Sequence, residues 1–262
     1  MNDEFYIGWE DKAAPRQRRF VRVVVLMLFI LALGVAFVLA AVQHATDASV
    51  FEFGEIKSFS GVLQMEPYPH LLVMRPGETA GCLTFSTYYL VLPFKHGLDR
   101  EQFAGLDGKN VSLKGTLIYR AGQTMVEALP ETIKAADKPV QELSGTEIVD
   151  LGKQTFEGEI VDSKCFLGVM NPGELLPHRA CAIRCIAGGI PPMLLVRQKN
   201  GSLVDLLLVS AEGKPVNQQV LDMVAEPVQI TGEVERQGDL LILRADPDSY
   251  RRLNKINDGT GK

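Results

Sequence analysis

A run of twenty uncharged residues at 23–42 constrains the fold and location of this chain more than any other feature. A helix rises about 1.5 Å per residue, so about 20 apolar residues span the roughly 30 Å hydrocarbon core of a bilayer. Five basic residues precede the run, and the next Lys or Arg after it is Lys57. Because basic flanks are retained in the cytoplasm, the sequence predicts a single-pass helix at 21–43 and a cytoplasmic segment at 1–20.

A cleaved signal peptide is the competing interpretation of the same run. The apolar part of a signal peptide is about 7–15 residues long, whereas this run is longer and follows a stretch with four acidic residues. We therefore expect an anchor that inserts residues 23–42 into the lipid bilayer of the cytoplasmic (inner) membrane. The C-terminal domains are then expected in the periplasm.

The overall charge argues against one class of partner. The chain carries 27 Lys and Arg against 32 Asp and Glu, for a formal net charge of −5. Nucleic-acid-binding proteins usually present a basic face, so no nucleic-acid partner is expected. Hydrophobic residues make up 46% of the chain, which is typical of a folded protein and excludes a disordered one.

Two similar patterns follow the apolar run. Residues 111–127 and 228–243 both read as a strand, a turn and a second strand, with apolar residues alternating around a glycine. In both, an apolar strand lies 25 residues before this glycine, which is Gly115 in the first unit and Gly232 in the second. The equal spacing indicates two units of the same kind.

The order of elements in each unit indicates a fold class. Strands, one short helix and a closing hairpin are the order of a five-stranded barrel of the OB type, and helix candidates lie at 99–103 and 217–221. We expect a mainly β fold with two tandem OB-like five-stranded barrels, each with a core of its own; one larger β-sandwich is the alternative. The expected boundaries are 50–133 for the first barrel, 134–152 for a linker, 153–248 for the second barrel and 249–262 for a tail.

The second unit is longer than the first in one place. Gly61 and Leu90 are 29 residues apart, whereas the corresponding Gly158 and Leu207 are 49 apart. The 20 additional residues belong to an early loop of the second unit, which contains three of the four cysteines. Long loops in compact domains are usually functional or disordered, and the composition of this one is not that of a disordered segment.

This loop contains one histidine and three cysteines in a regular pattern. Proline and glycine signals on either side predict a short helix within it. On that helix His178, Cys181 and Cys185 are spaced i, i+3 and i+7 and share one face. Cys165 follows the preceding strand, which gives C-x12-H-x2-C-x3-C. We expect the four residues to converge on one point.

Three interpretations of this pattern are open. Three thiolates and an imidazole form a closed tetrahedral set that suits zinc, and soft thiolates equally suit copper(I). Alternatively, Cys165 forms a disulfide with Cys181 or Cys185, because idle free thiols are uncommon in an oxidising compartment. The third interpretation is a catalytic thiolate activated by His178, for which the sequence identifies no third, orienting residue.

Two residues outside the loop are expected to have ordinary roles. Cys82 is interpreted as a small buried residue of the first barrel. His70 lies beside a proline-rich turn and is interpreted as a surface histidine.

The loop also resembles a known pattern. D-x-x-C followed by H-x-x-C-A-x-x-C-x-x-G-G-x-P, here from Asp162 to Pro191, is similar to a motif of secreted or membrane-anchored bacterial proteins of uncharacterised activity. That resemblance covers about 30 residues and implies no established activity. More loosely, an N-terminal anchor followed by an OB-type barrel is similar to the haem chaperones of cytochrome c maturation. Their haem-binding His-x-x-x-Tyr has no match near Tyr250.

Two classes of function follow from these features. An extracytoplasmic accessory or binding module, docked on a membrane or periplasmic protein partner such as a redox or metalloprotein complex, needs only an anchor and an exposed face. A thiol- or metal-dependent periplasmic enzyme centred on the Cys/His loop is the alternative, and it needs a reactive group open to water. No catalytic constellation stands out in the sequence, so the accessory class is favoured.

Overall fold

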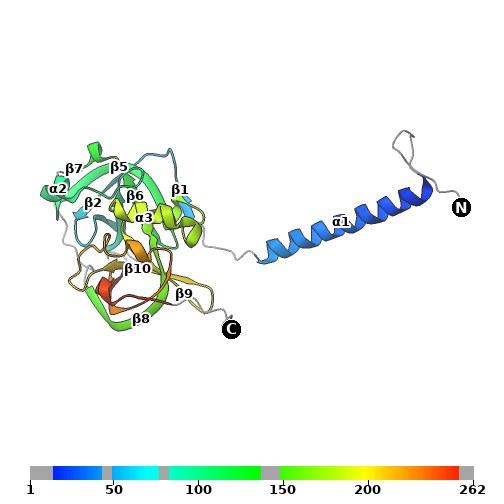
Figure 1. Cartoon of the computed structure of the whole chain (residues 1–262). Helices are drawn as coiled ribbons and strands as arrows, with labels where there is room; N and C mark the ends of the chain where they lie inside the picture. The colour runs from blue at the N-terminus through cyan, green and yellow to red at the C-terminus, as the bar shows by residue number, and fades with distance from the viewer. Residues whose placement is uncertain (1–13, 43–48, 77–82, 137–147, 254–262) are drawn as a thin grey trace. The chain divides into compact units, whose positions relative to one another are not determined.

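The computed structural model describes residues 14–42, 49–76, 83–136 and 148–253. The chain divides into two compact units, Met1–Asp47 and Ala48–Lys262. The first unit contains the helix α1 (Pro15–Val42), which carries the apolar run (Figure 1). α1 is long and apolar enough to cross a membrane, and none of its most apolar window is buried within the chain. A signal sequence near an N-terminus has the same properties.

The second unit begins with a closed five-stranded barrel. Its strands are β2 (Lys57–Gln64), β3 (His70–Pro76), β4 (Leu83–Val91), β5 (Asn110–Arg120) and β6 (Gln123–Ala128). They pair in the order β2-β3-β4-β6-β5, and β5 closes the barrel onto β2. β4 and β6 are parallel, whereas the other neighbours are antiparallel. The remaining elements are β1 (Ser49–Phe51), β7 (Lys134–Ala135) and the helix α2 (Arg100–Phe103).

A second closed barrel of the same strand order follows. Its strands are β8 (Ile148–Asp162), β9 (Pro192–Arg197), β10 (Leu203–Val209), β11 (Pro227–Gln237) and β12 (Leu240–Arg244). They pair in the order β8-β9-β10-β12-β11, and β11 closes the barrel onto β8. β10 and β12 are the parallel pair. A short strand, β13 (Arg251–Arg252), pairs antiparallel with the start of β11.

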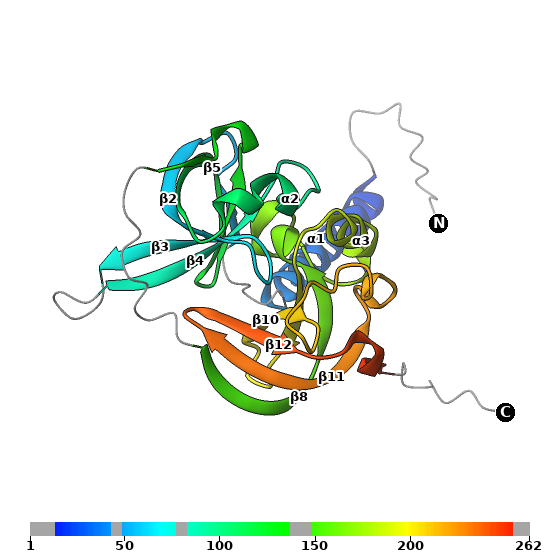
Figure 2. The same cartoon turned by 90° about the vertical axis from the view of Figure 1, so that its left-hand side faces the viewer.

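The two barrels establish the fold class. An apolar helix followed by two five-stranded OB-like barrels in a mainly β chain confirms the fold expected from the sequence, and a single β-sandwich is wrong. In Figure 2 the first barrel, labelled at β2, β3, β4 and β5, lies directly above the second, labelled at β8, β10, β11 and β12.

The two glycines of the hairpins have a steric role where each barrel closes. β5 and β11 alternate buried and exposed residues along their length. A Cβ on Gly115 would lie 2.5 Å from the carbonyl oxygen of Glu127, and one on Gly232 would lie 2.2 Å from that of Arg244. Because Cβ atoms do not approach backbone this closely, glycine is required for the neighbouring strand to pass at these points.

One expected helix is absent. Residues 217–221 form turns that lead into one 3-10 turn, Leu221–Met223. The Asn217 side chain donates hydrogen bonds to the carbonyl oxygens of Ile186 and Ile190, at 2.8 and 2.9 Å. These tertiary bonds outweigh the weak local helix propensity of the segment.

Strands also extend beyond the expected barrel boundaries. β7 pairs with β5 inside the segment 134–152 that was expected to be a linker, and β8 already begins at Ile148. Residues 137–147 of that linker lie outside the described residues. β13 pairs with β11 inside the expected tail, 249–262. β7 and β13 form because β5 and β11 each have backbone hydrogen-bonding groups at an exposed edge.

Three clusters of buried apolar side chains stabilise the second unit. One cluster lies in each barrel, as expected. The third is shared, because it includes Tyr89, Ile118 and Met125 of the first barrel together with Leu195 and Leu207 of the second. The barrels therefore form one compact unit, and separating them would expose this third cluster to water.

Buried polar groups join the barrels as well. The Tyr68 hydroxyl donates to the carbonyl oxygen of Leu208 at 3.2 Å and accepts the N–H of Val216 at 3.0 Å. The expectation that His70 lies at the surface is wrong: it is buried in β3, and its Nδ1 bonds the Tyr68 carbonyl oxygen at 2.8 Å. Burial lowers the pKa of His70. The second barrel covers the proline-rich turn, and no local sequence signal reports that contact.

Candidate metal centre

The long loop between β8 and β9 carries the Cys/His pattern. It spans residues 163–191, where the equivalent loop between β2 and β3 has only residues 65–69. A single π-helical turn, Cys165–Val169, follows the end of β8, and a 3-10 turn, Leu176–His178, leads into the helix α3 (Arg179–Ala187). The short helix predicted from the proline and glycine signals is therefore present.

The end of α3 lies against the first barrel. Gly188 ends the helix, where its N–H donates to the carbonyl oxygen of Cys185 at 3.1 Å. The carbonyl oxygen of Gly188 accepts the N–H of Gly97, in the segment between β4 and α2, at 2.8 Å. Both views in Figures 1 and 2 place α3 where the two barrels meet. The loop is thus held by both barrels.

The three thiols of the loop lie close together. The Sγ atom of Cys165 is 3.9 Å from that of Cys181 and 4.0 Å from that of Cys185. A ring nitrogen of His178 lies within 4.8 Å of the sulfurs of Cys165 and Cys181. Cys165, Cys185 and His178 are buried, whereas Cys181 is half-buried. The structure therefore places the four residues in two overlapping groups that share Cys165: Cys165 with His178 and Cys181, and Cys165 with Cys185 and Asp162, the ligand atoms within each group lying within 4.8 Å of one another.

Asp162 connects the two halves of the cluster. This carboxylate, at the end of β8, is fully buried. Its Oδ1 accepts the N–H of Cys165 at 2.8 Å, and its Oδ2 accepts the Nε2–H of His178 at 2.9 Å. Histidines that bind metals commonly donate their second ring N–H to a carboxylate, which fixes the tautomer and the orientation of the ring. Asp162 holds His178 in this way and leaves the Nδ1 lone pair as the available ligand atom.

Lys95 brings a positive charge to the sulfurs from the first barrel. Its Nζ donates to Sγ of Cys181 at 2.7 Å and lies 3.5 Å from Sγ of Cys185. The hydrogen bond to Cys181 raises the pKa of the Lys95 ammonium. Sequence reasoning did not identify Lys95, because 86 residues separate it from Cys181 and nothing in its own neighbourhood marks it. The sequence analysis named Asp162 only as the first residue of the D-x-x-C motif and predicted no role for it.

Cys165 and Cys185 shift each other's pKa. The hydrogen bond that Cys165 shares with Cys185 lowers the pKa of Cys185, and the nearby Lys95 ammonium lowers it further. The same hydrogen bond, together with burial, raises the pKa of Cys165.

The spacing of the sulfurs fits a metal ion. In a tetrahedral site with a zinc–sulfur bond of about 2.3 Å, neighbouring sulfurs lie roughly 3.8 Å apart. The distances from Cys165 to the other two sulfurs, 3.9 and 4.0 Å, are close to this value. Cys165 can therefore share a metal ion with His178 and Cys181, or with Cys185 and Asp162.

Buried cations fix the turn that carries Cys165. Lys164 is almost fully buried, and its Nζ donates to the carbonyl oxygens of Leu92 and Phe94 at 2.9 and 2.7 Å and pairs with Glu127 at 2.5 Å. On the other side, Arg120 of β5 donates to the carbonyl oxygen of Phe166 at 3.1 Å. Both contacts cross from one barrel to the other, so the position of Cys165 depends on the first barrel. Cys82 lies outside the described residues.

Comparisons with known proteins do not extend this description. No family model matches the chain, and no curated protein matches it. Among solved structures, a deletion mutant of the single-stranded DNA binding protein from Thermus aquaticus is similar at 13% sequence identity and a TM-score of 0.24. That match covers 80% of this chain and 90% of the other. A likeness of this size carries no conclusion about what the present chain binds.

Proposed function

We propose that this chain is a membrane-anchored extracytoplasmic binding module whose long loop is held by a zinc ion on Cys165, His178, Cys181 and Cys185. The observation that carries the proposal is the central position of Cys165. Its sulfur lies at nearly equal distances, 3.9 and 4.0 Å, from the other two. A disulfide would join Cys165 to one of them and leave the third idle, whereas a metal ion uses all three.

The charges around the sulfurs favour zinc over copper. Three thiolates on Zn²⁺ and the buried Asp162 carboxylate together leave two negative charges, of which the Lys95 ammonium, 2.7 Å from Cys181, balances one. Copper(I) with the same ligands would leave three negative charges in a site that is largely buried. An uncompensated charge in such a place is costly, so the residues present match zinc better.

The same ligand set supports an accessory role rather than catalysis. Structural zinc sites are closed by four protein ligands, whereas catalytic sites keep one position for water or substrate. Three cysteines and one histidine close the set. In this proposal the ion stabilises the junction of the two barrels, and an exposed face of the module docks on a membrane or periplasmic protein partner.

Zinc content and its dependence on His178 test the proposal. The full chain, purified in detergent, is expected to contain one zinc per chain by elemental analysis. In His178→Ala the zinc affinity should fall by more than the roughly 10–100-fold typical of losing an outer-shell group, because a ligand atom is lost. His96→Ala, at an exposed histidine, serves as the control. A disulfide in place of the ion, or full zinc retention in His178→Ala, contradicts the proposal.

The extracytoplasmic location has a separate test. Basic residues precede the apolar run 23–42, four of them in the first turns of α1, and this supports a cytoplasmic location for that end. A reporter enzyme that is active only outside the cytoplasm should therefore be active when fused after Lys262. Activity of a cytoplasm-only reporter at the same position would show that the orientation is reversed.

A thiol-dependent enzyme is the second candidate, and it is favoured by the Asp162–His178 pair. With a thiol nearby, this pair has the order of a nucleophile, a base and an orienting carboxylate. However, Cys165 and Cys185 are buried, and a nucleophile has to meet its substrate. If a single thiol of the metal-free chain is alkylated rapidly, and His178→Ala slows that reaction, the result would favour this alternative over the zinc module.

A further inference from the structure

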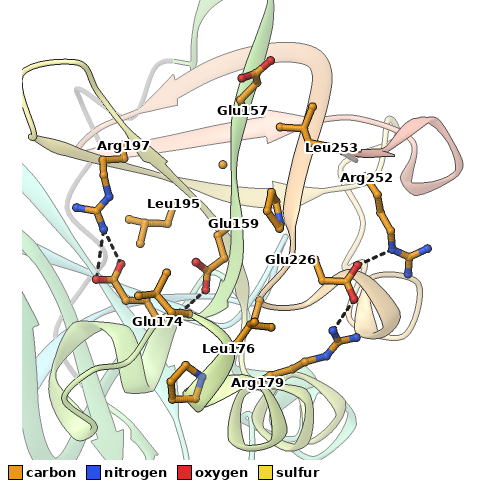
Figure 3. A pocket seen from close by; sticks show the side chains of 15 residues that line it. Glu157, Glu159, Glu174, Leu176, Arg179, Leu195, Arg197, Glu226, Arg252 and Leu253 are labelled. Atoms are coloured by element: carbon orange, nitrogen blue, oxygen red, sulfur yellow. Dashed lines mark hydrogen bonds and ion pairs between the residues drawn. The ribbon is translucent and has the colours of Figure 1, made fainter. Parts of the chain in front are cut away.

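The second barrel carries a cavity that is separate from the sulfur cluster. Its volume is about 910 Å³, which lies within the range of about 300–1,000 Å³ typical of small-molecule sites. β8, β9, the start of β11 and the loop before α3 contribute its walls (Figure 3). The zinc proposal makes no use of this space.

Apolar side chains form much of the cavity wall. Leu175 and Leu176 come from the loop, and they are 51% and 59% exposed although they are large and apolar. Leu195 of β9 also lines this cavity. Exposed apolar side chains around a concave surface are typical of a ligand site. A ligand with an apolar body would cover these side chains.

The arginines of the cavity are already neutralised. Arg197 pairs with Glu174 at 3.3 Å. Arg179 and Arg252 both pair with Glu226, and Arg252 also pairs with Asp222 at 2.8 Å. Figure 3 shows these two groups of ion pairs on opposite sides of Glu159. The cavity therefore presents no unpaired arginine to an anionic ligand.

Glu159 is a carboxylate near the centre of the cavity that takes part in none of these ion pairs; Glu157, which also lines the cavity, is exposed and accepts a hydrogen bond from Gln229 at 3.2 Å. Glu159 lies between Leu176 and Leu195 in Figure 3, and its Oε1 accepts the backbone N–H of Leu175 at 2.5 Å. Within the described part of the chain no ion pair involves Glu159. Partial burial raises its pKa, which means that the cavity disfavours the bare negative charge. A cation bound beside it would relieve that cost.

The backbone that meets Glu159 is strained. Leu175 has a φ of 67°, a left-handed conformation that non-glycine residues rarely adopt. Such strain, held in place by the surrounding structure, is concentrated at ligand sites. Here it turns the Leu175 N–H toward the carboxylate and leaves the leucine side chain exposed at the cavity.

We propose that this cavity binds a small organic cation, namely a primary ammonium on an apolar body. The ammonium pairs with Glu159, and the apolar body contacts Leu176 and Leu195. A neutral ligand of the same shape would leave the carboxylate without a partner, and an anionic ligand would be repelled by it. The site is thus selective for charge as well as for size.

Binding of 4-fluorobenzylamine to the full chain in lipid nanodiscs tests this assignment, with ¹⁹F NMR as the readout and empty nanodiscs as the reference. Glu159→Gln keeps an oxygen for the Leu175 N–H and removes the charge, so the Kd should rise at least about tenfold. Glu212→Gln, at a carboxylate outside the cavity, should leave the Kd unchanged. The neutral isostere 4-fluorobenzyl alcohol should bind the unmodified chain at least about tenfold more weakly than the amine.

Several results would overturn the proposal. These are failure of the amine to bind, equal binding of amine and alcohol, and an unchanged Kd in Glu159→Gln. If Glu159→Gln does not fold, Leu176→Ala gives an independent test at an exposed position, and it should weaken binding of the amine. A lysine presented on a peptide, Nα-acetyl-lysine methylamide, should bind more weakly than the small amine; tighter binding would reject a small-molecule ligand in favour of a protein partner.

Discussion

Replacing Cys165 by serine is expected to abolish stoichiometric zinc binding by the full chain. The Cys165 sulfur lies 3.9 and 4.0 Å from the other two and belongs to both groups of candidate ligands, so its loss removes a ligand from each group. A serine hydroxyl does not supply the thiolate that a structural zinc site uses. Zinc per chain, measured by elemental analysis, should fall from about one to below the detection limit.

The same substitution should lower the stability of the two-barrel unit, Ala48–Lys262. An ion that binds only the folded chain adds about 4 kcal/mol when its free concentration is a thousandfold above the Kd. Cys165→Ser should therefore unfold at lower denaturant concentration than the parent and should no longer respond to added zinc. Cys82→Ser is the control at the cysteine outside the loop, and we expect it to retain zinc. Full zinc occupancy in Cys165→Ser would contradict the proposed ligand set.

Removing the carboxylate of Glu127 is expected to destabilise the second unit by about 3–5 kcal/mol. Glu127 pairs at 2.5 Å with Lys164, whose side chain is 2% exposed. Glu127→Ala would leave that ammonium buried with only the carbonyl oxygens of Leu92 and Phe94 as partners. A buried charge without a counter-ion costs far more than the pair itself contributes. Denaturant unfolding followed by circular dichroism measures the loss.

Two variants separate the buried charge from general effects of substitution. Glu131→Ala removes an exposed carboxylate of the same barrel and should change the free energy of unfolding by less than about 0.5 kcal/mol. The double variant Glu127→Gln with Lys164→Met removes both charges, so it should be less destabilised than Glu127→Ala. Equal losses for Glu127→Ala and Glu131→Ala would show that the pair does not hold the loop.

The fold was accessible from the sequence because its signals are local. Alternation around Gly115 and Gly232 identified the closing hairpins, and the equal spacing of the preceding strands identified two units of one kind. The absent helix at 217–221 shows where such reasoning stops. There, Asn217 bonds the carbonyls of Ile186 and Ile190, and no pattern within the segment reports a contact with a distant loop.

The candidate site likewise contains residues that local sequence patterns predicted and residues that they did not. The spacing of His178, Cys181 and Cys185 predicted one shared face of a short helix; in the structure His178 immediately precedes α3 and lies near Cys181, whereas Cys185 groups with Cys165 and Asp162. Lys95 reaches the sulfurs from another barrel, and its charge depends on how the barrels dock. The burial of His70 arises in the same way, because the second barrel covers the turn before β3. Contacts between the barrels, rather than residues within one barrel, account for what the sequence did not reveal.

The crossing of Lys95 and Arg120 from the first barrel to the loop has a consequence for the order of assembly. Chains are synthesised from the N-terminus, and early domains generally fold first. The first barrel is therefore available, with its cations in place, when Cys165 emerges, whereas β11 and β12 are still to be made. It can act as a template on which the loop is laid down before the second barrel closes. The contacts that Lys95 and Arg120 make with the loop would then form early, and the thiols would be covered before the second barrel is complete.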